Sequence, residues 1–325
     1  MITSKIVATG AGLPEQIITN DDLAKIVDTS DEWISQRTGI KERRISSGEN
    51  LSVLASRAAK QIIERAGIEA EEIDLIIVAT CTADYGTPCL ACMVQKEIGA
   101  VNAVAFDVTA ACSGFLFATS VADKFIRCGV YKNALVIGGE LLSKIIDWTD
   151  RSTCVLFGDG AAGVLLERTE GDDGIVIEEL GSQGDMYEVL TAGYTAASNA
   201  FNDVPPLDKM DFVHMDGREV FKFATKKIAE SVSRVMDKAG VTSEEIKYFV
   251  PHQANARIVE VAARKLDIPY EKFYMNIERF GNTSSASIPT ALNEMNEKGL
   301  LQKGDKVILC GFGGGLSWGT ILLTW

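Results

Sequence analysis

The chain repeats itself at a spacing close to half its length. Three segments recur in the same order at nearly one offset. The segment AGIEAEEIDLIIV, which begins at Ala66, recurs 173 residues later as AGVTSEEIKYFV, which begins at Ala239. The segment Asn133–Gly139 recurs as Asp305–Gly311 at an offset of 172, and Lys5–Ala8 recurs as Gly174–Ile177 at an offset of 169. A period of this size is a domain, not a solenoid repeat. We therefore predict two related halves, residues 1–173 and 174–325, in a chain of 325 residues that is long enough to bury a large core.

Within each half, short apolar runs alternate with helical patterns. Leu75–Thr80, Ala103–Asp107 and Ala134–Gly138 are continuous apolar runs, whereas Ser52–Arg65 and Gly114–Arg127 have helical spacing. Strands buried on both faces and separated by helices predict an α/β fold with a mostly parallel sheet.

The most apolar stretch, Ile308–Leu323, is 16 residues long and contains five glycines. It is shorter than the roughly 20 residues of a membrane-spanning helix, so we interpret it as two strands around a glycine loop.

Composition narrows the class of partner. The chain is 46% hydrophobic and 24% charged, as expected for a globular protein, and its net charge of −13 argues against nucleic acid and anionic membranes as partners. An acidic protein could bind only where basic residues cluster. Residues 1–7 lack the features of a signal peptide, so we expect a cytoplasmic protein.

Seven cysteines, an odd number scattered through apolar segments, favour reduced thiols over a disulfide framework. We expect six of them in the core. Cys89 and Cys92 have the spacing of a redox or metal pair, but no second pair follows, and the two histidines, His214 and His252, are distant in sequence. We therefore predict no metal site.

Cys112 lies where a predicted strand, ending near Val108, meets a predicted helix. Apolar residues recur at helical spacing after it, which places its sulfur at or near a helix N-terminus. There the helix dipole would lower the pKa of the thiol and favour a nucleophilic thiolate. The alternative is a small buried cysteine.

Two further side chains point to the same region. His252 follows the predicted strand Lys247–Pro251, and the carboxyl ends of such strands are where α/β folds build their sites. Asn282 could be a turn residue, but the internal alignment brings its segment close to the counterpart of the Cys112 segment. A thiol, an imidazole and a carboxamide in these settings predict covalent acyl chemistry.

The segment Gly311–Gly319 admits two interpretations. It could be a tight hairpin, or its glycines could let backbone N–H groups approach a substrate oxygen, as an oxyanion hole requires. No Lys-Ser or Lys-Thr closes it, so it is not a phosphate-binding loop.

Taken together, these motifs resemble those of β-ketoacyl-acyl-carrier-protein synthase III, an initiating condensing enzyme of the thiolase-like superfamily. The likeness covers nearly the whole chain; its motifs are DEWI from Asp31, RTGI from Arg37, the Cys112 segment, Asp150-Arg151, FGDGA from Phe157, Pro251–Asn255, Glu278–Ser284 and Gly311–Gly319. The resemblance implies a duplicated α-β-α-β-α layered sandwich in which the halves share a central helix layer.

The resemblance also implies a reaction. Cys112 would take an acyl group from acyl-CoA, with the N–H groups of Cys112 and Gly314 as the oxyanion hole. His252 and Asn282 would hydrogen-bond the thioester carbonyl of malonyl-acyl-carrier protein during decarboxylation. Condensation would give a 3-oxoacyl product without a metal or bound cofactor.

Other positions match binding sites of the family. Trp33 and Arg151 would hold the CoA adenine between them, with Arg37 near the phosphates. Thr87 matches a site that lines the acyl pocket across a homodimer interface and is bulkier in members restricted to short primers. Acetyl-CoA is the expected primer, with longer or branched primers as the alternative. The residues expected to dock the acidic carrier protein are Lys222, Arg257, Arg264 and Lys265.

Competing classes fit less well. A biosynthetic thiolase would be expected to use a second catalytic cysteine, and elongating condensing enzymes a second histidine in place of Asn282. A chalcone-synthase-like enzyme shares Cys, His and Asn and is the nearest alternative, although its chains are typically longer. A papain-like hydrolase also uses Cys, His and Asn, but without a tandem α/β duplication. A non-catalytic carrier-binding paralogue would not need all three residues.

Overall fold

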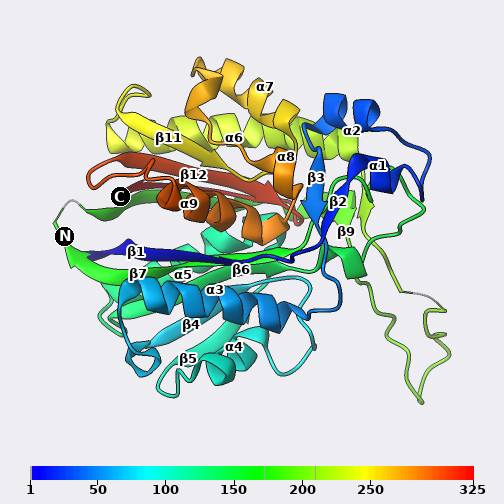
Figure 1. The fold of residues 1–325 in the computed structure, drawn as a ribbon, viewed down its shortest axis with the longest axis horizontal. Helices are drawn as coiled ribbons and strands as arrows, with labels where there is room; N and C mark the ends of the chain where they lie inside the picture. Colours follow the sequence, from blue (N-terminus) through cyan, green and yellow to red (C-terminus); the bar gives the residue numbers. More distant parts are fainter. Residues whose placement is uncertain (1, 172, 209) are drawn as a thin grey trace.

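The computed structural model describes residues 2–171, 173–208 and 210–325. Two sheets are stacked between layers of helices (Figure 1). The first sheet has the order β1-β7-β6-β4-β5 and consists of β1 (Ile2–Gly12), β7 (Gly160–Glu170), β6 (Asn133–Glu140), β4 (Leu75–Ala79) and β5 (Val104–Val108). The second has the order β11-β12-β13-β8 and consists of β11 (Ile246–Pro251), β12 (Lys306–Gly313), β13 (Ser317–Thr324) and β8 (Gly174–Ser182).

Both sheets are mixed, so the prediction of a mostly parallel sheet is wrong. β4 is parallel to β5 and β6, and β11 is parallel to β12, but the remaining four pairings are antiparallel. Parallel neighbours need a crossover connection, usually a helix. The short glycine-rich turn after β12 instead returns the chain directly as β13, which agrees with the interpretation of Ile308–Leu323 as two strands around a loop.

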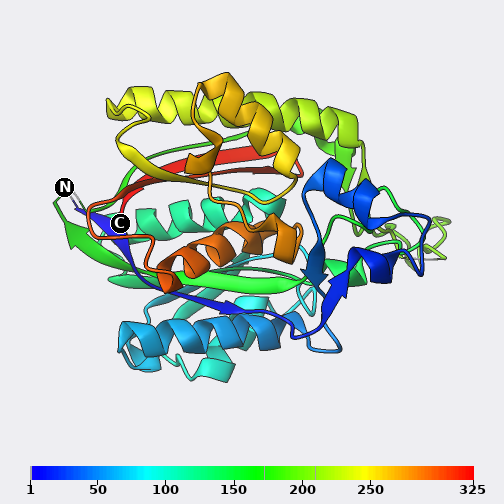
Figure 2. The ribbon, with the colours of Figure 1, turned by 45° about the horizontal axis from the view of Figure 1, so that its top comes forward.

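Helices form the outer and central layers. The outer face of the first sheet is covered by α3 (Leu51–Ala66) and α4 (Leu90–Ile98), and that of the second by α6 (Gly217–Ala239) and α7 (Ala256–Leu266). Between the sheets lie α5 (Gly114–Arg127) and α9 (Ser287–Glu297) (Figures 1 and 2). This arrangement confirms the predicted layered sandwich with a shared central helix layer.

The sheets are apolar on both faces because each face packs against helices. In β4, Ile76 and Val78 join the outer core under α3 and α4, whereas Leu75 and Ile77 join the central core with α5 and α9. The central core combines residues from both halves of the chain, among them Phe115 of α5. Burial on both faces is why these strands appear in the sequence as continuous apolar runs.

The repeated segments form equivalent elements. The repeat from Ala66 ends α3 and leads into β4, and its copy from Ala239 ends α6 and leads into β11. Both helices end at a left-handed glycine, Gly67 with φ 67° and Gly240 with φ 66°. A residue with a side chain would be strained at this position, so the glycine marks the helix end in both copies.

Short elements complete the fold. They are β2 (Ile17–Thr19) paired with β3 (Glu42–Arg44), β9 (Leu190–Thr191) paired with β10 (His214–Met215), α1 (Asn20–Leu23), α2 (Asp31–Thr38), α8 (Ile277–Phe280), and the 3-10 turns η1 (Ala70–Glu72), η2 (Ala111–Ser113), η3 (Leu142–Lys144), η4 (Gly184–Val189), η5 (Tyr270–Lys272) and η6 (Ser284–Ala286).

The cysteines correct another expectation. Only Cys154 and Cys310 are fully buried, whereas Cys112 and Cys89 are half-buried and Cys81, Cys92 and Cys128 are exposed. The prediction of six core cysteines is therefore wrong. An apolar neighbourhood in the sequence does not fix which way one small side chain faces at a helix end or after a strand.

Candidate active site

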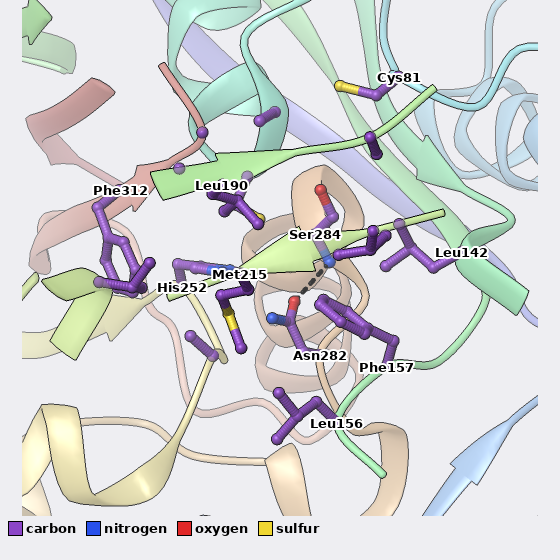
Figure 3. Close-up of a pocket in the computed structure, with 18 of the residues that line it drawn as sticks. Cys81, Leu142, Leu156, Phe157, Leu190, Met215, His252, Asn282, Ser284 and Phe312 are labelled. Atoms are coloured by element: carbon purple, nitrogen blue, oxygen red, sulfur yellow. Dashed lines mark hydrogen bonds between the residues drawn. The ribbon is translucent and has the colours of Figure 1, made fainter. Parts of the chain in front are cut away.

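The three side chains singled out in the sequence line one cavity of about 580 Å³. Cys112 lies in η2 at the start of α5, His252 follows the end of β11, and Asn282 lies between α8 and η6. Figure 3 shows His252, Asn282 and Ser284 close together among the apolar side chains around this cavity. Residues that are far apart in sequence thus meet at one site.

The backbone around Cys112 forms a tight turn. Ala111 has φ 46°, a left-handed value that residues other than glycine rarely adopt, and Ser284 repeats it with φ 50° in the second half of the chain. The strand end at Gly313 passes so close that an added Cβ would lie 2.6 Å from the Cys112 nitrogen. Only glycine fits there. The next residue, Gly314, lines the same cavity as Cys112.

The Cys112 thiol does not have the lowered pKa that its position at a helix start predicts. Burial is the largest influence and raises the pKa of Cys112 to about 12; a hydrogen bond with Ser284 acts in the opposite direction, and the Glu140 carboxylate adds to the increase. Desolvation of the charged sulfur outweighs the stabilisation that the start of α5 offers. Cys112 is therefore a neutral thiol that loses its proton only as it reacts.

His252 is buried with one ring nitrogen unpaired. Its Nδ1 lies 2.6 Å from the Ser287 hydroxyl oxygen, whereas its Nε2 is buried and has no hydrogen-bond partner among the described residues. Burial lowers the pKa of His252 to about 3, so the ring is neutral at physiological pH. The ring also meets Phe312 edge to face, with centroids 5.4 Å apart.

The contacts of Ser287 favour one tautomer of the neutral ring. Its hydroxyl oxygen accepts the backbone N–H of Gln253 at 3.3 Å. We therefore assign the Ser287 O–H as donor to His252 Nδ1, which places the ring proton on Nε2. His252 then offers an N–H donor to a ligand in the cavity.

Asn282 is oriented in a comparable way. Its Oδ1 accepts the backbone N–H of Ser284 at 2.9 Å, drawn as a dashed line in Figure 3. The backbone of Asn282 is held by Leu156 and Gly158, through hydrogen bonds of 2.8 and 3.0 Å. With Oδ1 occupied, the amide group is left to donate. The site therefore presents two neutral donors near the Cys112 sulfur.

One buried acid at this site was missed in the sequence. Glu140, the last residue of β6, is fully buried, and burial raises its pKa to about 7. It accepts hydrogen bonds from Thr80, Cys81 and Thr82 after β4 and from Ser284 and Ser285 in η6. The available signal was an acidic residue that directly follows the apolar and glycine run Ala134–Gly139.

The residues expected to bind CoA lie together near the cavity. The guanidinium carbons of Arg37 and Arg151 lie 4.6 and 5.4 Å from the Trp33 ring centroid. α2, which carries Trp33 and Arg37, is tied to the cavity rim because Asn255 donates to the Arg37 carbonyl at 3.0 Å. Arg151 contacts the tryptophan directly, so a base can enter between them only if the arginine moves.

The residues expected to dock the carrier protein are exposed on two neighbouring helices. Lys222 lies on α6, and Arg257, Arg264 and Lys265 lie on α7. Lys265 joins the helices by donating to a backbone carbonyl of α6 at 3.2 Å. Residues of both helices, Val220 and Ile258 among them, line the cavity, so this basic surface adjoins its mouth.

Thr87 lies elsewhere. It is exposed in the loop before α4 and is not among the residues that line the Cys112 cavity of its own chain. Among the described residues there is no group of three or more side chains suited to hold a metal ion, and no helix long and apolar enough to cross a membrane.

The layered fold and this site together define a class of protein. A cysteine thiol that shares one cavity with two neutral hydrogen-bond donors, in a duplicated thiolase-like sandwich, is the arrangement of an acyl-transferring condensing enzyme.

Comparisons with known proteins specify the family. Residues 106–184 and 236–325 match the models for 3-oxoacyl-[acyl-carrier-protein] synthase III and for its C-terminal part. Beta-ketoacyl-[acyl-carrier-protein] synthase III from Clostridium acetobutylicum is 53% identical, and that from Clostridium novyi 52%; the alignments cover 100% of this chain and 99% and 100% of the relatives.

A solved structure agrees. The crystal structure of 3-oxoacyl-[acyl-carrier-protein] synthase III from Aquifex aeolicus is 46% identical with a TM-score of 0.93, over 99% of this chain and 100% of that one. The chain belongs to the β-ketoacyl-acyl-carrier-protein synthase III family. This confirms the resemblance drawn from its motifs, and the chalcone-synthase-like alternative is not favoured.

Proposed function

We propose that this chain transfers an acyl primer from CoA to Cys112 and condenses it with malonyl-acyl-carrier protein to 3-oxoacyl-acyl-carrier protein and carbon dioxide. The observation that carries the proposal is one cavity lined by the Cys112 thiol, by His252, whose Nε2 has no partner among the described residues, and by the amide of Asn282. A cysteine hydrolase would pair the thiol with a basic histidine, whereas burial keeps the pKa of His252 at about 3.

In the first step the Cys112 sulfur attacks the thioester carbonyl of acyl-CoA. A bond forms between that carbon and Cys112, the bond to the CoA sulfur breaks, and the thiol proton leaves with CoA. The backbone N–H groups of Cys112 and Gly314 would stabilise the oxyanion. Because the pKa of Cys112 is about 12, deprotonation has to accompany attack.

In the second step malonyl-acyl-carrier protein loses carbon dioxide, and the electron pair of the broken bond becomes an enolate. Negative charge develops on the thioester oxygen, where the N–H groups of His252 and Asn282 would donate. The enolate carbon then attacks the Cys112 thioester, and the cysteine sulfur leaves as a thiolate that takes up a proton from solvent. A neutral histidine suits this role because it keeps its Nε2 proton throughout.

Substrate binding extends the same proposal. Trp33, Arg37 and Arg151 would hold the CoA nucleotide, and the basic surface of α6 and α7 would dock the acidic carrier protein. We also propose a homodimer. β5 is the end strand of the first sheet and has no partner on its outer edge among the described residues, and its first residue, Val104, is 48% exposed.

Intact-protein mass spectrometry tests the proposal. Acetyl-CoA should add one acetyl group, which is absent in Cys112→Ser, and malonyl-acyl-carrier protein should then remove it as a 3-oxoacyl product. His252→Ala and Asn282→Ala should keep acylation but lose about 100-fold or more in condensation, since each removes a donor to the enolate. An adduct lost only to water would reject the condensing function.

A further inference from the structure

Glu140 is a fully buried acid that takes no part in the two steps proposed above. Its oxygen Oε2 accepts the Thr80 and Thr82 hydroxyls at 3.2 and 2.5 Å. The Cys81 N–H is shared between the two carboxylate oxygens, at 3.2 Å from Oε1 and 3.1 Å from Oε2. Hydrogen bonds from such donors stabilise the charged form of an acid, so a carboxylate can exist here although it is buried.

The oxygen Oε1 of Glu140 faces the turn η6. The hydroxyl oxygens of Ser284 and Ser285 each lie 3.3 Å from it. Ser285 also donates to the Ala79 carbonyl at 2.8 Å, the shorter of its two contacts, so we assign its hydrogen to that carbonyl. Ser284 is therefore the hydroxyl that donates to Oε1, and a proton can reach the carboxylate through it.

Ser284 connects this carboxylate to the nucleophile. Its side chain lines the active-site cavity and hydrogen-bonds with the Cys112 thiol. The thiol can donate to the Ser284 oxygen while the Ser284 O–H donates to Glu140, which makes a continuous chain of donors that ends at a carboxylate. Hydrogen bonds of this kind are commonly long before substrate binds and tighten in the complex.

His252 does not supply a base for the thiol. Its Nδ1 accepts the Ser287 hydroxyl, its Nε2 carries the ring proton, and burial keeps the pKa of the ring at about 3. Burial instead raises the pKa of Glu140 to about 7. A base with a pKa near the working pH is partly charged there and still binds a proton well, which suits general acid–base catalysis.

The titratable side chains that face Glu140 from neighbouring elements, in the described part of the chain, are two thiols and one ammonium group. They are Cys81 after β4, Cys112 of η2 and Lys144 of η3. Burial raises the pKa of both thiols, so they stay neutral where Glu140 titrates. The positive charge of Lys144 favours the carboxylate form of Glu140.

We propose that Glu140, acting through the Ser284 hydroxyl, accepts the Cys112 proton during acylation and returns it to the CoA leaving group, an inference that rests on the condensing function proposed above. As the sulfur attacks the thioester, the S–H proton moves to the Ser284 oxygen and the Ser284 proton moves to Glu140 Oε1. When the bond to the CoA sulfur breaks, Ser284 gives a proton to that sulfur and Glu140 returns its own to Ser284. Glu140 is then a carboxylate again, and the thiol proton has left with CoA.

The rate of acylation by acetyl-CoA, followed by intact-protein mass spectrometry at several pH values, tests this relay. In the unaltered protein the rate should rise about tenfold per pH unit below pH 7 and level off above it, because only the carboxylate accepts the proton. Glu140→Gln should slow acylation at pH 7 at least about tenfold and lose the plateau. A purely electrostatic role predicts the opposite, since the Glu140 charge raises the pKa of Cys112 and its removal would speed acylation.

Ser284→Ala keeps the acid and removes the link to the thiol. Alanine fits this backbone geometry, because Ala111 has φ 46° where Ser284 has φ 50°. The variant should slow acylation at least about tenfold, whereas malonyl-acyl-carrier protein should discharge its acyl-enzyme within about threefold of the unaltered rate. Ser285→Ala is the matched control: it removes the other hydroxyl beside Oε1 and should keep the pH profile of the unaltered protein.

The same measurements separate the relay from the condensing function. No acetyl adduct on the unaltered protein would reject the function and the relay together. If the unaltered protein is acylated, and Glu140→Gln or Ser284→Ala reacts at least as fast with the same pH profile, the relay is wrong and the condensing function stands.

Discussion

At the scale of single residues, the Ser287 hydroxyl decides which ring nitrogen of His252 carries the proton. Ser287→Ala removes the group 2.6 Å from Nδ1 and frees the ring to adopt the other tautomer. We expect condensation to slow by about 10- to 100-fold, the effect of losing one well-placed hydrogen bond worth roughly 1.4–2.7 kcal/mol. Acylation of Cys112 should be nearly unchanged. Single-turnover measurements of the two half-reactions check this.

Ser287→Thr is the matched control because it keeps the hydroxyl, and it should restore most of the condensation rate. If Ser287→Ala slows acylation and condensation to the same extent, Ser287 supports the fold and does not orient the histidine.

At the scale of secondary-structure elements, Glu140 joins the ends of β4 and β6 to η6, the turn that orients Asn282. Burial raises its pKa from 4.5 to about 7, so the folded protein binds this proton more tightly than the unfolded chain does. Glu140 therefore contributes its full share to the free energy of unfolding below about pH 4.5. This contribution, up to about 3 kcal/mol, is lost as the pH rises toward 7.

Glu140→Gln removes this titration. We expect the melting temperature of the variant to rise relative to that of the unaltered protein between pH 5 and pH 8, measured by calorimetry. Glu178→Gln, on β8 away from the cavity, provides a carboxylate control. If the difference in melting temperature between Glu140→Gln and the unaltered protein stays constant from pH 5 to pH 8, Glu140 does not titrate in this range.

At the scale of the whole molecule, the two halves share one core. α5 from the first half and α9 from the second pack between the sheets, and Arg127 of α5 donates to the Ile175 carbonyl of β8 at 2.7 Å. We expect residues 1–173 and 174–325, expressed separately, to lack cooperative unfolding, because each exposes half of this core. Co-expression should restore a soluble complex with condensing activity. Cooperative unfolding of either half alone would show that it is an independent domain.

Primer choice also belongs to this scale, since Thr87 is exposed in its own chain and would line the acyl pocket only across the proposed dimer. Thr87→Phe should reduce acylation by branched or longer acyl-CoA at least about tenfold relative to acetyl-CoA, because one added ring fills the pocket. Thr87→Ser, which keeps a small side chain, serves as control. The ratio of acylation rates checks this, and an unchanged ratio would place Thr87 outside the pocket.

The sequence by itself determined the duplication, the α/β class, the main strands and helices, and the family. Repeats, apolar runs and glycine helix ends are local, and burial on both faces of a strand leaves its mark on consecutive residues. Helical spacing of apolar residues is also a local pattern, and it predicted a helix over Gly114–Arg127, the bounds that α5 has in the structure.

Only the tertiary structure decided the rest. The Ser287–His252 contact spans 35 residues, and Glu140 contacts Ser284 and Ser285 across 144 and 145, so both depend on which strand ends become neighbours. The mixed sheets arise from direct returns such as the turn into β13, and the raised pKa of Cys112 arises from burial that a helix start does not reveal. Pairing and desolvation are properties of the assembled chain, and no local pattern encodes them.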